Sequence, residues 1–226
     1  GPVITVVQDL YDNLYKDNRL YISYRNSIKS GFGLLDDYAF YIYAQLNMYD
    51  ATLDKNYLDK ALTLCKKTIS DFYDNENGGF FLSGNENEQL IIRPKETYDG
   101  AIPSGNSVMS YNLLRLSHFT KDKELERICE EQLKFMSSYA KDYPIGYSFY
   151  LLALSIYLNP LMDIVCVLKD KSDLLKLSGK TKLNTNIIVF EEPSQDYPLL
   201  NDKTTFYICH NRSCLPPTNN FSEVLI

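Results

Sequence analysis

The stretch Tyr49-Asp-Ala-Thr-Leu-Asp-Lys55 returns in altered form as Ser117-His-Phe-Thr-Lys-Asp-Lys123. Both copies contain Thr-x-Asp-Lys, and Thr52 and Thr120 lie 68 positions apart (120 − 52). In each copy an apolar helical pattern ends before the threonine, and an amphipathic one begins after the lysine. Two helices joined by a short turn, with a long loop after each pair, are typical of stacked αα-hairpins. The repeat therefore predicts a mainly α-helical fold.

Apolar residues recur at spacings of three and four over most of the first 157 residues, which indicates amphipathic helices. We expect helices at residues 3–16, 35–50, 55–73, 107–119, 125–140 and 147–157. The first helix has a predicted apolar face made of Val3, Val6, Val7, Leu10 and Leu14. A short strand is expected at residues 20–24. Turn residues around two short apolar runs predict a β-hairpin at residues 80–92.

The pattern changes after Asn159-Pro160. Apolar runs at residues 162–168, 186–190 and 205–209 predict strands, residues 172–177 predict a short helix, and a terminal helix is expected from residue 221. A strand, a helix and two further strands suggest a small α/β unit. We therefore expect a helical-hairpin domain at residues 1–159 and a small α/β segment at residues 160–226.

Charge and composition narrow the class of protein. The net charge is −6 and the sequence pI is about 5.0, and no basic stripe is present, which argues against a nucleic-acid partner. The sequence contains no run of about 18 apolar residues, so no membrane span is predicted. Residues 1–7 lack the basic region of a signal peptide. Five scattered cysteines fit a reducing compartment, so we expect a cytoplasmic protein.

The run Arg93-Pro-Lys-Glu-Thr-Tyr-Asp-Gly-Ala-Ile-Pro-Ser-Gly-Asn-Ser107 is the best candidate for a functional site. It is too polar for a core and leads directly into a predicted helix. Glu96 and Asp99, together with Asp37 in the first turn of another helix, are candidate catalytic carboxylates, because paired carboxylates perform acid–base chemistry on sugars.

The other candidate residues would bind the ligand. Tyr38, Tyr98 and Asn106 could supply aromatic surface and an amide, and Arg93 could hold a carboxylate or an anionic ligand. Ser104 is a candidate ligand contact and also a plausible helix N-cap, but its context does not favour a nucleophile.

A purely structural interpretation of the same run remains open. Arg93 would pair with Glu96, Asp99 would cap a turn, and Asn106 would cap a helix. The segment Cys209-His-Asn-Arg-Ser-Cys214 also allows alternatives, namely a redox pair or two reduced thiols in a loop. It offers too few ligands for a metal site, and no cofactor is predicted.

Four motifs occur in order: Leu34-Leu-Asp-Asp-Tyr-Ala-Phe40, Asn77-Gly-Gly-Phe-Phe81, the run 93–107, and Cys214-Leu-Pro-Pro217. Together they resemble the C-terminal part of the thioredoxin domain-containing, or spermatogenesis-associated, protein family. The resemblance implies a thioredoxin-like N-terminal domain, an (α/α)6 toroid similar to N-acylglucosamine 2-epimerases and six-hairpin glycosidases, and a short α/β tail. It also implies that this chain is a fragment with about the last half of the toroid, so that the N-terminal half and the thioredoxin-like domain would be its partners.

Two functions follow as hypotheses from the residues and the resemblance. The first is a sugar-like ligand pocket, with acid–base chemistry on a carbohydrate. The alternative is a non-catalytic interaction scaffold that serves the thioredoxin-like domain. Epimerases of the resembled fold use histidines, yet His118 and His210 both lie outside the run 93–107. A half toroid would expose an apolar edge, so we also expect dimerisation or marginal solubility.

Overall fold

The computed structural model describes residues 2–87, 92–179, 185–210 and 213–224. The chain forms two compact units. The helical unit consists of Gly1–Leu46 with Leu58–Ser155, and the sheet unit consists of Asn47–Tyr57 with Ile156–Ile226. The predicted domain boundary near residue 160 stays a prediction.

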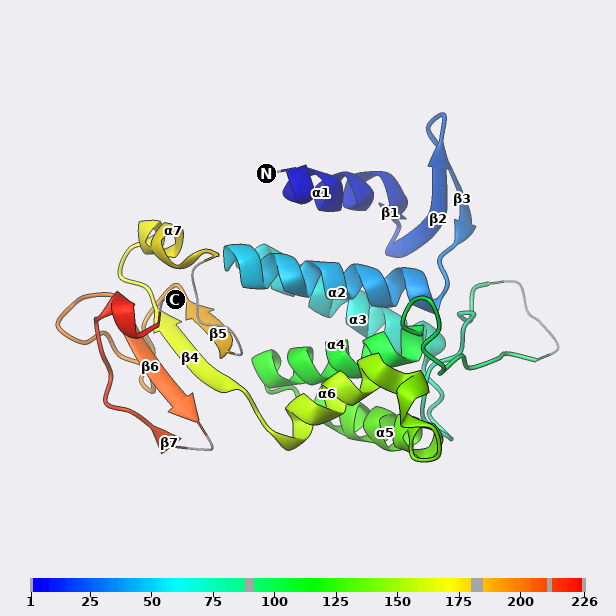
Figure 1. Ribbon diagram of the computed structural model, residues 1–226. Coiled ribbons are helices and arrows are strands. Elements are labelled where there is room, and N and C mark those ends of the chain that lie inside the picture. Colours follow the sequence, from blue (N-terminus) through cyan, green and yellow to red (C-terminus); the bar gives the residue numbers. More distant parts are fainter. Residues whose placement is uncertain (1, 88–91, 180–184, 211–212, 225–226) are drawn as a thin grey trace. The chain divides into compact units, whose positions relative to one another are not determined.

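The helical unit begins with a helix and a small antiparallel sheet (Figure 1). Their bounds are α1 Pro2–Leu14, β1 Tyr15–Lys16, β2 Arg19–Arg25 and β3 Ile28–Phe32. Both connecting turns place two consecutive residues at positive φ, Asp17 with Asn18 and Asn26 with Ser27. Such left-handed pairs suit the twist of a tight hairpin. The predicted strand at 20–24 is present, whereas β3 was not predicted from the sequence.

The predicted apolar face of α1 is wrong in part. Val7 is buried, but Val6 is 56% exposed and Leu10 is 41% exposed. The Tyr41 hydroxyl donates to the Val7 carbonyl at 2.9 Å, which fixes the side of α1 that packs. Val6 and Leu10 therefore do not belong to the buried core.

The main helices agree with the sequence prediction to within a few residues. Their bounds are α2 Leu35–Thr52, α3 Lys55–Phe72, α4 Gly105–Thr120, α5 Lys123–Ala140 and α6 Ser148–Leu158, with a short 3₁₀ helix, η1 Pro144–Tyr147, before the last. Asp36 and Asp37 occupy the first turn of α2, where the helix dipole favours acidic groups.

The two copies of Thr-x-Asp-Lys fold into the same turn. The residue at x, Leu53 in the first copy and Lys121 in the second, has a φ of 58° and 54°, respectively. In both copies the threonine hydroxyl donates to the carbonyl four residues earlier, at 2.6 and 2.8 Å. In both, the aspartate accepts the N–H two residues later, at 3.0 and 2.9 Å, and so caps the next helix. The repeat is therefore a repeat of structure as well as of sequence.

Side chains from α2, α4 and α6 meet inside the helical unit. Tyr43, Tyr111 and Phe149 form an edge-to-face trio with ring centroids 5.5 to 5.9 Å apart. The buried Asn112 amide of α4 donates to the Ala39 carbonyl of α2 at 2.8 Å. These contacts join α2, α4 and α6 within the helical unit.

The predicted β-hairpin at residues 80–92 is wrong for the described residues, and Leu90 and Ile91 lie outside them. Only an isolated bridge joins Tyr73 and Phe80. The Phe80 N–H donates to the Asn106 side chain, and the Leu82 N–H donates to the Pro94 carbonyl. These partners use the backbone groups that a hairpin ladder would need.

The sheet unit carries a four-stranded mixed sheet in the order β5-β4-β6-β7. Its elements are β4 Met162–Val167, η2 Lys171–Asp173, α7 Leu174–Leu177, β5 Thr185–Phe190, β6 Thr205–His210, β7 Ser213–Cys214 and η3 Phe221–Glu223. β4 pairs with β5 in parallel and with β6 antiparallel. The predicted terminal helix shortens to the single turn η3, and its last positions lie outside the described residues.

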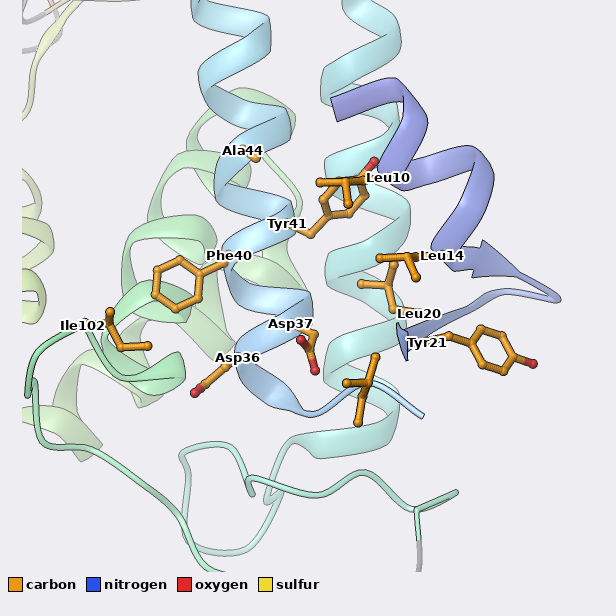
Figure 2. Close-up of a pocket in the computed structure, with 11 residues that line it drawn as sticks. Leu10, Leu14, Leu20, Tyr21, Asp36, Asp37, Phe40, Tyr41, Ala44 and Ile102 are labelled. Carbon is orange, nitrogen blue, oxygen red and sulfur yellow. The ribbon is translucent and has the colours of Figure 1, made fainter. Parts of the chain in front are cut away.

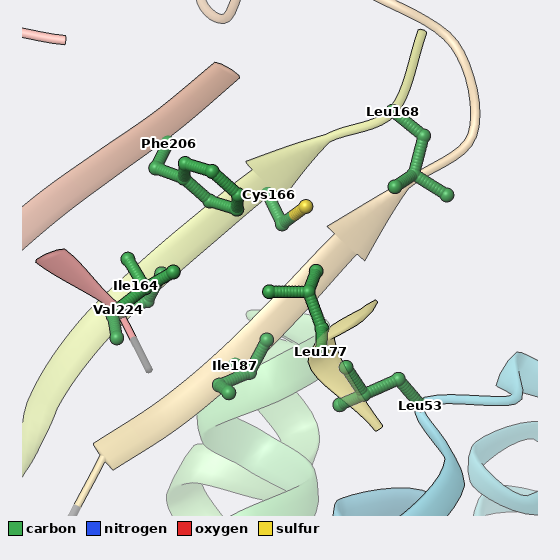
Figure 3. Packing of buried hydrophobic residues seen from close by; sticks show 8 residues of the cluster. All are labelled: Leu53, Ile164, Cys166, Leu168, Leu177, Ile187, Phe206 and Val224. Carbon is green, nitrogen blue, oxygen red and sulfur yellow. The ribbon is translucent and has the colours of Figure 1, made fainter. Parts of the chain in front are cut away.

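The sheet unit has its own apolar core (Figure 3). Buried side chains of β4, β5 and β6 pack with Leu177 of α7, with Val224, and with Leu53 from the repeat turn. The Tyr49 hydroxyl also donates to the Ile187 carbonyl at 2.8 Å. The α2–α3 turn is therefore part of the sheet unit.

Cys209 and Cys214 form a disulfide between β6 and β7. The interpretation of these two residues as reduced thiols is therefore wrong in this structure. Cys65, Cys129 and Cys166 are free and buried. Within the described residues, no helix is both long and apolar enough to cross a membrane.

Candidate functional site

In the run 93–107, residues 93–103 form a loop, Ser104 is the N-cap of α4, and residues 105–107 lie in the first turn of that helix. Ser104 is the cap, since its hydroxyl accepts the Ser107 N–H at 3.2 Å, and it also donates to the Thr97 carbonyl at 3.0 Å. The loop therefore folds back on the helix it precedes. Ser104 is 7% exposed, so its hydroxyl is committed to this turn.

Asp99 joins two helix N-termini. One carboxylate oxygen accepts the Ser104 N–H at 2.9 Å, and the other accepts the Phe149 N–H in the first turn of α6 at 2.8 Å. Its own N–H donates to the Gly146 carbonyl at 2.8 Å. Both carboxylate oxygens thus cap backbone groups, as in the structural interpretation of the sequence.

Arg93 is held by the loop that precedes it. Its guanidinium donates to the Ser83 carbonyl at 3.1 Å and to the Asn85 side chain at 3.0 Å, and it lies 4.3 Å from the centre of the Phe81 ring. The predicted Arg93–Glu96 pair does not appear among these contacts. This guanidinium stabilises the loop around residues 81–85.

Asn106 and Tyr38 lie in the interior. Asn106 is fully buried, and its amide donates to the carbonyls of Phe80 and Glu96 at 2.9 and 2.8 Å. Tyr38 is 3% exposed, and its hydroxyl accepts the Leu20 N–H at 3.0 Å. Both side chains connect segments that are distant in the sequence.

Tyr98 is the exposed aromatic residue of the loop. It is 57% exposed and stacks on Tyr143, with 6.4 Å between ring centroids and 8° between ring planes. A Cβ on Gly146 would come within 2.4 Å of the Tyr98 ring, so that glycine leaves room for it. The ring is presented to solvent on a well-packed support.

The helical unit contains a pocket of about 430 Å³ beside the N-terminal half of α2 (Figure 2). Its walls are mostly apolar and come from α1, β2, α2 and the run 93–107. The lining residues are Leu10, Leu14, Leu20, Tyr21, Ile22, Asp36, Asp37, Phe40, Tyr41, Ala44 and Ile102. Figure 2 shows Asp36 and Asp37 at one end of this set, with Asp36 toward Ile102 and Asp37 toward Leu20.

Asp36 is the carboxylate with the most unusual surroundings in this pocket. Its pKa is raised, chiefly because burial removes water from the charged form, and the nearby carboxylates Glu96 and Asp37 raise it further. A hydrogen bond from the Gly105 N–H, at the start of α4, acts in the opposite direction. The side chain thus lies where two helix N-termini and the loop meet.

Asp37 has a partly structural role. Its carboxylate accepts the Leu34 N–H at 2.8 Å, which caps the start of α2, while the side chain remains exposed and lines the pocket. Of the three predicted catalytic carboxylates, the structure therefore brings Asp37 and Glu96 near Asp36. It directs Asp99 to the start of α6 instead.

Asp36 was missed by the sequence interpretation, which chose its neighbour. A helical signal was available, because Asp36, Phe40 and Tyr43 follow a spacing of four and three along α2. The aromatic trio shows that Tyr43 faces α4 and α6. Asp36 lies on that same face of α2, so Asp36, rather than Asp37, is the acid expected near the run 93–107.

No cluster of three or more potential metal-ligating side chains occurs within residues 2–87, 92–179, 185–210 and 213–224. The arrangement around Asp36 is therefore a group of carboxylates at an apolar pocket. It is suited to accepting hydrogen bonds from hydroxyl groups and to exchanging a proton.

Comparison with known proteins supplies relatives for this chain. It is 30% identical to spermatogenesis-associated protein 20 of Homo sapiens over an alignment of 209 positions that covers 85% of the chain, and equally to the Mus musculus protein of that name. It is 28% identical over 202 residues to an uncharacterised protein of Caenorhabditis elegans. No family model matches the chain. The chain has homologues named spermatogenesis-associated protein 20, and it spans about a quarter of their length.

Proposed function

We propose that the pocket beside α2 binds a sugar-like ligand and that Asp36 acts on it as a general acid. The observation that carries this proposal is the raised pKa of Asp36 at the wall of a 430 Å³ pocket. Functional sites concentrate groups whose pKa is shifted, because acid–base catalysis is most efficient when the pKa lies closer to the working pH. Asp37 is the second carboxylate of the site, and Glu96, on the loop side, adds to the rise that burial causes in the pKa of Asp36.

The lining of the pocket supports a ligand with one apolar face and several hydroxyl groups. Phe40, Tyr41 and Tyr21 supply aromatic surface, and the aliphatic side chains exclude water. Carboxylates accept hydrogen bonds from hydroxyl groups. A pyranose combines an apolar ring face with hydroxyl groups at its edge, so it matches both parts of the lining.

The proposal also places the chain in a larger protein. We infer that it belongs to the family of its homologues and that its helical unit is part of an (α/α)6-type toroid, with α2, α4 and α6 as inner helices. The repeat turns and the aromatic trio support this inference. In the homologues the remaining length would contain the other half of the toroid and the thioredoxin-like domain, in the cytoplasm.

A non-catalytic scaffold is the second candidate, and the bonds of the run 93–107 favour it. Ser104, Asp99, Asn106 and Arg93 direct polar atoms to backbone groups of the helical unit. On this account, the run fixes helix ends so that the helical unit presents a rigid surface to an attached domain. The carboxylates at the pocket would then have no ligand.

A thermal-shift screen distinguishes the two candidates. The chain is heated with a panel of neutral and amino sugars, and Asp36→Asn is compared with Asp142→Asn, which alters an exposed acid outside the pocket. Binding of a sugar to the folded chain raises the melting temperature. We expect at least one sugar to stabilise the wild type and Asp142→Asn but not Asp36→Asn. Stabilisation by none of the sugars would favour the scaffold.

A further inference from the structure

The disulfide of the sheet unit lies at the edge of its sheet. Cys209 of β6 and Cys214 of β7 stand directly opposite each other, with Cα atoms 4.0 Å apart. β7 is only two residues long and is the last strand in the sheet order. Cys214 is exposed, whereas Cys209 is half-buried. The two residues therefore differ in their exposure to solvent.

The other three cysteines are free thiols that are buried in the fold. Cys65, Cys129 and Cys166 are at most 2% exposed, and burial raises the pKa of each thiol to about 12. A thiol is nucleophilic only as the thiolate. Thiol chemistry in the folded chain is thereby confined to Cys209 and Cys214.

We propose that the Cys209–Cys214 disulfide is a thiol–disulfide exchange site for a dithiol reductant and that the reductant attacks Cys214. The first thiolate of the reductant bonds to the Cys214 sulfur, the Cys209–Cys214 bond breaks, and Cys209 leaves with the electron pair and takes up a proton. The second thiolate of the reductant then displaces Cys214, which also takes up a proton. The chain gains two electrons and two protons, and the reductant becomes a disulfide.

The fold around the disulfide permits this cycle without unfolding. Beyond β7 the returning chain remains bonded to β6, since Phe206 and Thr218 exchange two backbone hydrogen bonds of 2.8 and 3.0 Å. The Phe221 ring also packs edge-on against Phe206, at 4.9 Å between centroids. Opening the disulfide removes one link at the outer end of the sheet and leaves these contacts intact.

Trapping a mixed disulfide tests the site and the direction of attack together. The folded chain is first oxidised with glutathione disulfide, cleared of free reagent, and treated briefly with reduced glutathione. Glutathione is a monothiol, so completing the reduction needs a second molecule, and a brief treatment favours the mixed disulfide of the first step. N-ethylmaleimide then blocks free thiols, and peptide mass mapping locates each adduct. The double variant with Cys209→Ser and Cys214→Ser is the control for adducts at other cysteines.

We expect glutathione on Cys214 and maleimide on Cys209, with about tenfold less of the reverse pattern, because attack follows exposure. Dithiothreitol should reduce the disulfide in the folded chain while Cys65, Cys129 and Cys166 stay unlabelled. Equal amounts of glutathione on Cys209 and Cys214, or more on Cys209, would overturn the assignment of Cys214 as the residue that is attacked. A disulfide that fails to form, or that opens only in urea, would overturn the exchange site.

Discussion

The Gly105 N–H, at the first residue of α4, donates a hydrogen bond to the Asp36 carboxylate in the first turn of α2. A Cβ on Gly105 would lie 2.4 Å from the carboxylate oxygen and 2.8 Å from Leu35. The absence of a side chain thus allows the start of α4 to approach the acid. This contact connects the candidate loop to the pocket.

Gly105→Ala should destabilise the helical unit by about 1–3 kcal/mol, because the added methyl group forces the two helix starts apart. Gly100→Ala is the matched control, since a Cβ there meets nothing within 4 Å. It should change stability by less than about 1 kcal/mol, in the stabilising direction. Urea unfolding followed by near-ultraviolet circular dichroism measures both. Equal effects of the two substitutions would contradict the close contact.

Asp36→Asn should stabilise the chain increasingly as the pH rises from about 3 to about 7. The folded state raises the pKa of Asp36 above its ordinary value of 3.8, so folding disfavours the charged form. Stability from this group is complete below the ordinary pKa and is lost as the pH rises through the folded-state pKa. Asparagine remains uncharged and keeps an oxygen for the Gly105 N–H. Unfolding free energies of variant and wild type across this range give the test, and a difference independent of pH would argue against a raised pKa.

Asp99→Ala should cost about 1–2 kcal/mol of stability, because the Ser104 and Phe149 N–H groups lose the carboxylate that caps them. Glu96→Ala should stay within about 0.5 kcal/mol of the wild type, since Glu96 is an exposed surface side chain. The comparison uses urea unfolding midpoints. A larger loss from Glu96→Ala than from Asp99→Ala would reverse the roles assigned to these carboxylates.

Lys121→Gly should stabilise the helical unit by about 0.5–1 kcal/mol, because Lys121 ends α4 in the left-handed region that glycine adopts without strain. Lys134→Gly, inside α5, should destabilise it by about 1 kcal/mol. Opposite signs in thermal or urea unfolding are the expected result. Destabilisation by both substitutions would show that the repeat turn needs its lysine side chain.

Local patterns in the sequence were enough to locate the helices and their caps. The recurrence of apolar residues at spacings of three and four predicts α2 and α4, and the sequence context predicts Ser104 as an N-cap, which its bond to the Ser107 N–H confirms. The strands β4, β5 and β6 also followed from their apolar runs. These features depend on residues within a few positions of one another.

Those local patterns do not predict contacts between residues that are far apart in the sequence. The predicted hairpin at 80–92 does not form in the described residues, because the Phe80 N–H donates to the side chain of Asn106, 26 positions away. Asp36 gains its properties from Glu96 and Gly105, which only the packing of α2 against the loop brings near. The choice between Asp36 and Asp37 likewise required the orientation of α2.

Methyl-resolved NMR of the chain, with isotope-labelled isoleucine and leucine, tests the central claim most directly. The sugar that gives the largest thermal shift is titrated into the labelled protein. Ile22 and Ile102 line the pocket, whereas Ile145 and Leu175 are similarly exposed but lie outside it. The account predicts saturable shifts of the Ile22 and Ile102 methyl signals that disappear in Asp36→Asn. Shifts confined to Ile145 or Leu175, or shifts that persist in Asp36→Asn, would contradict it.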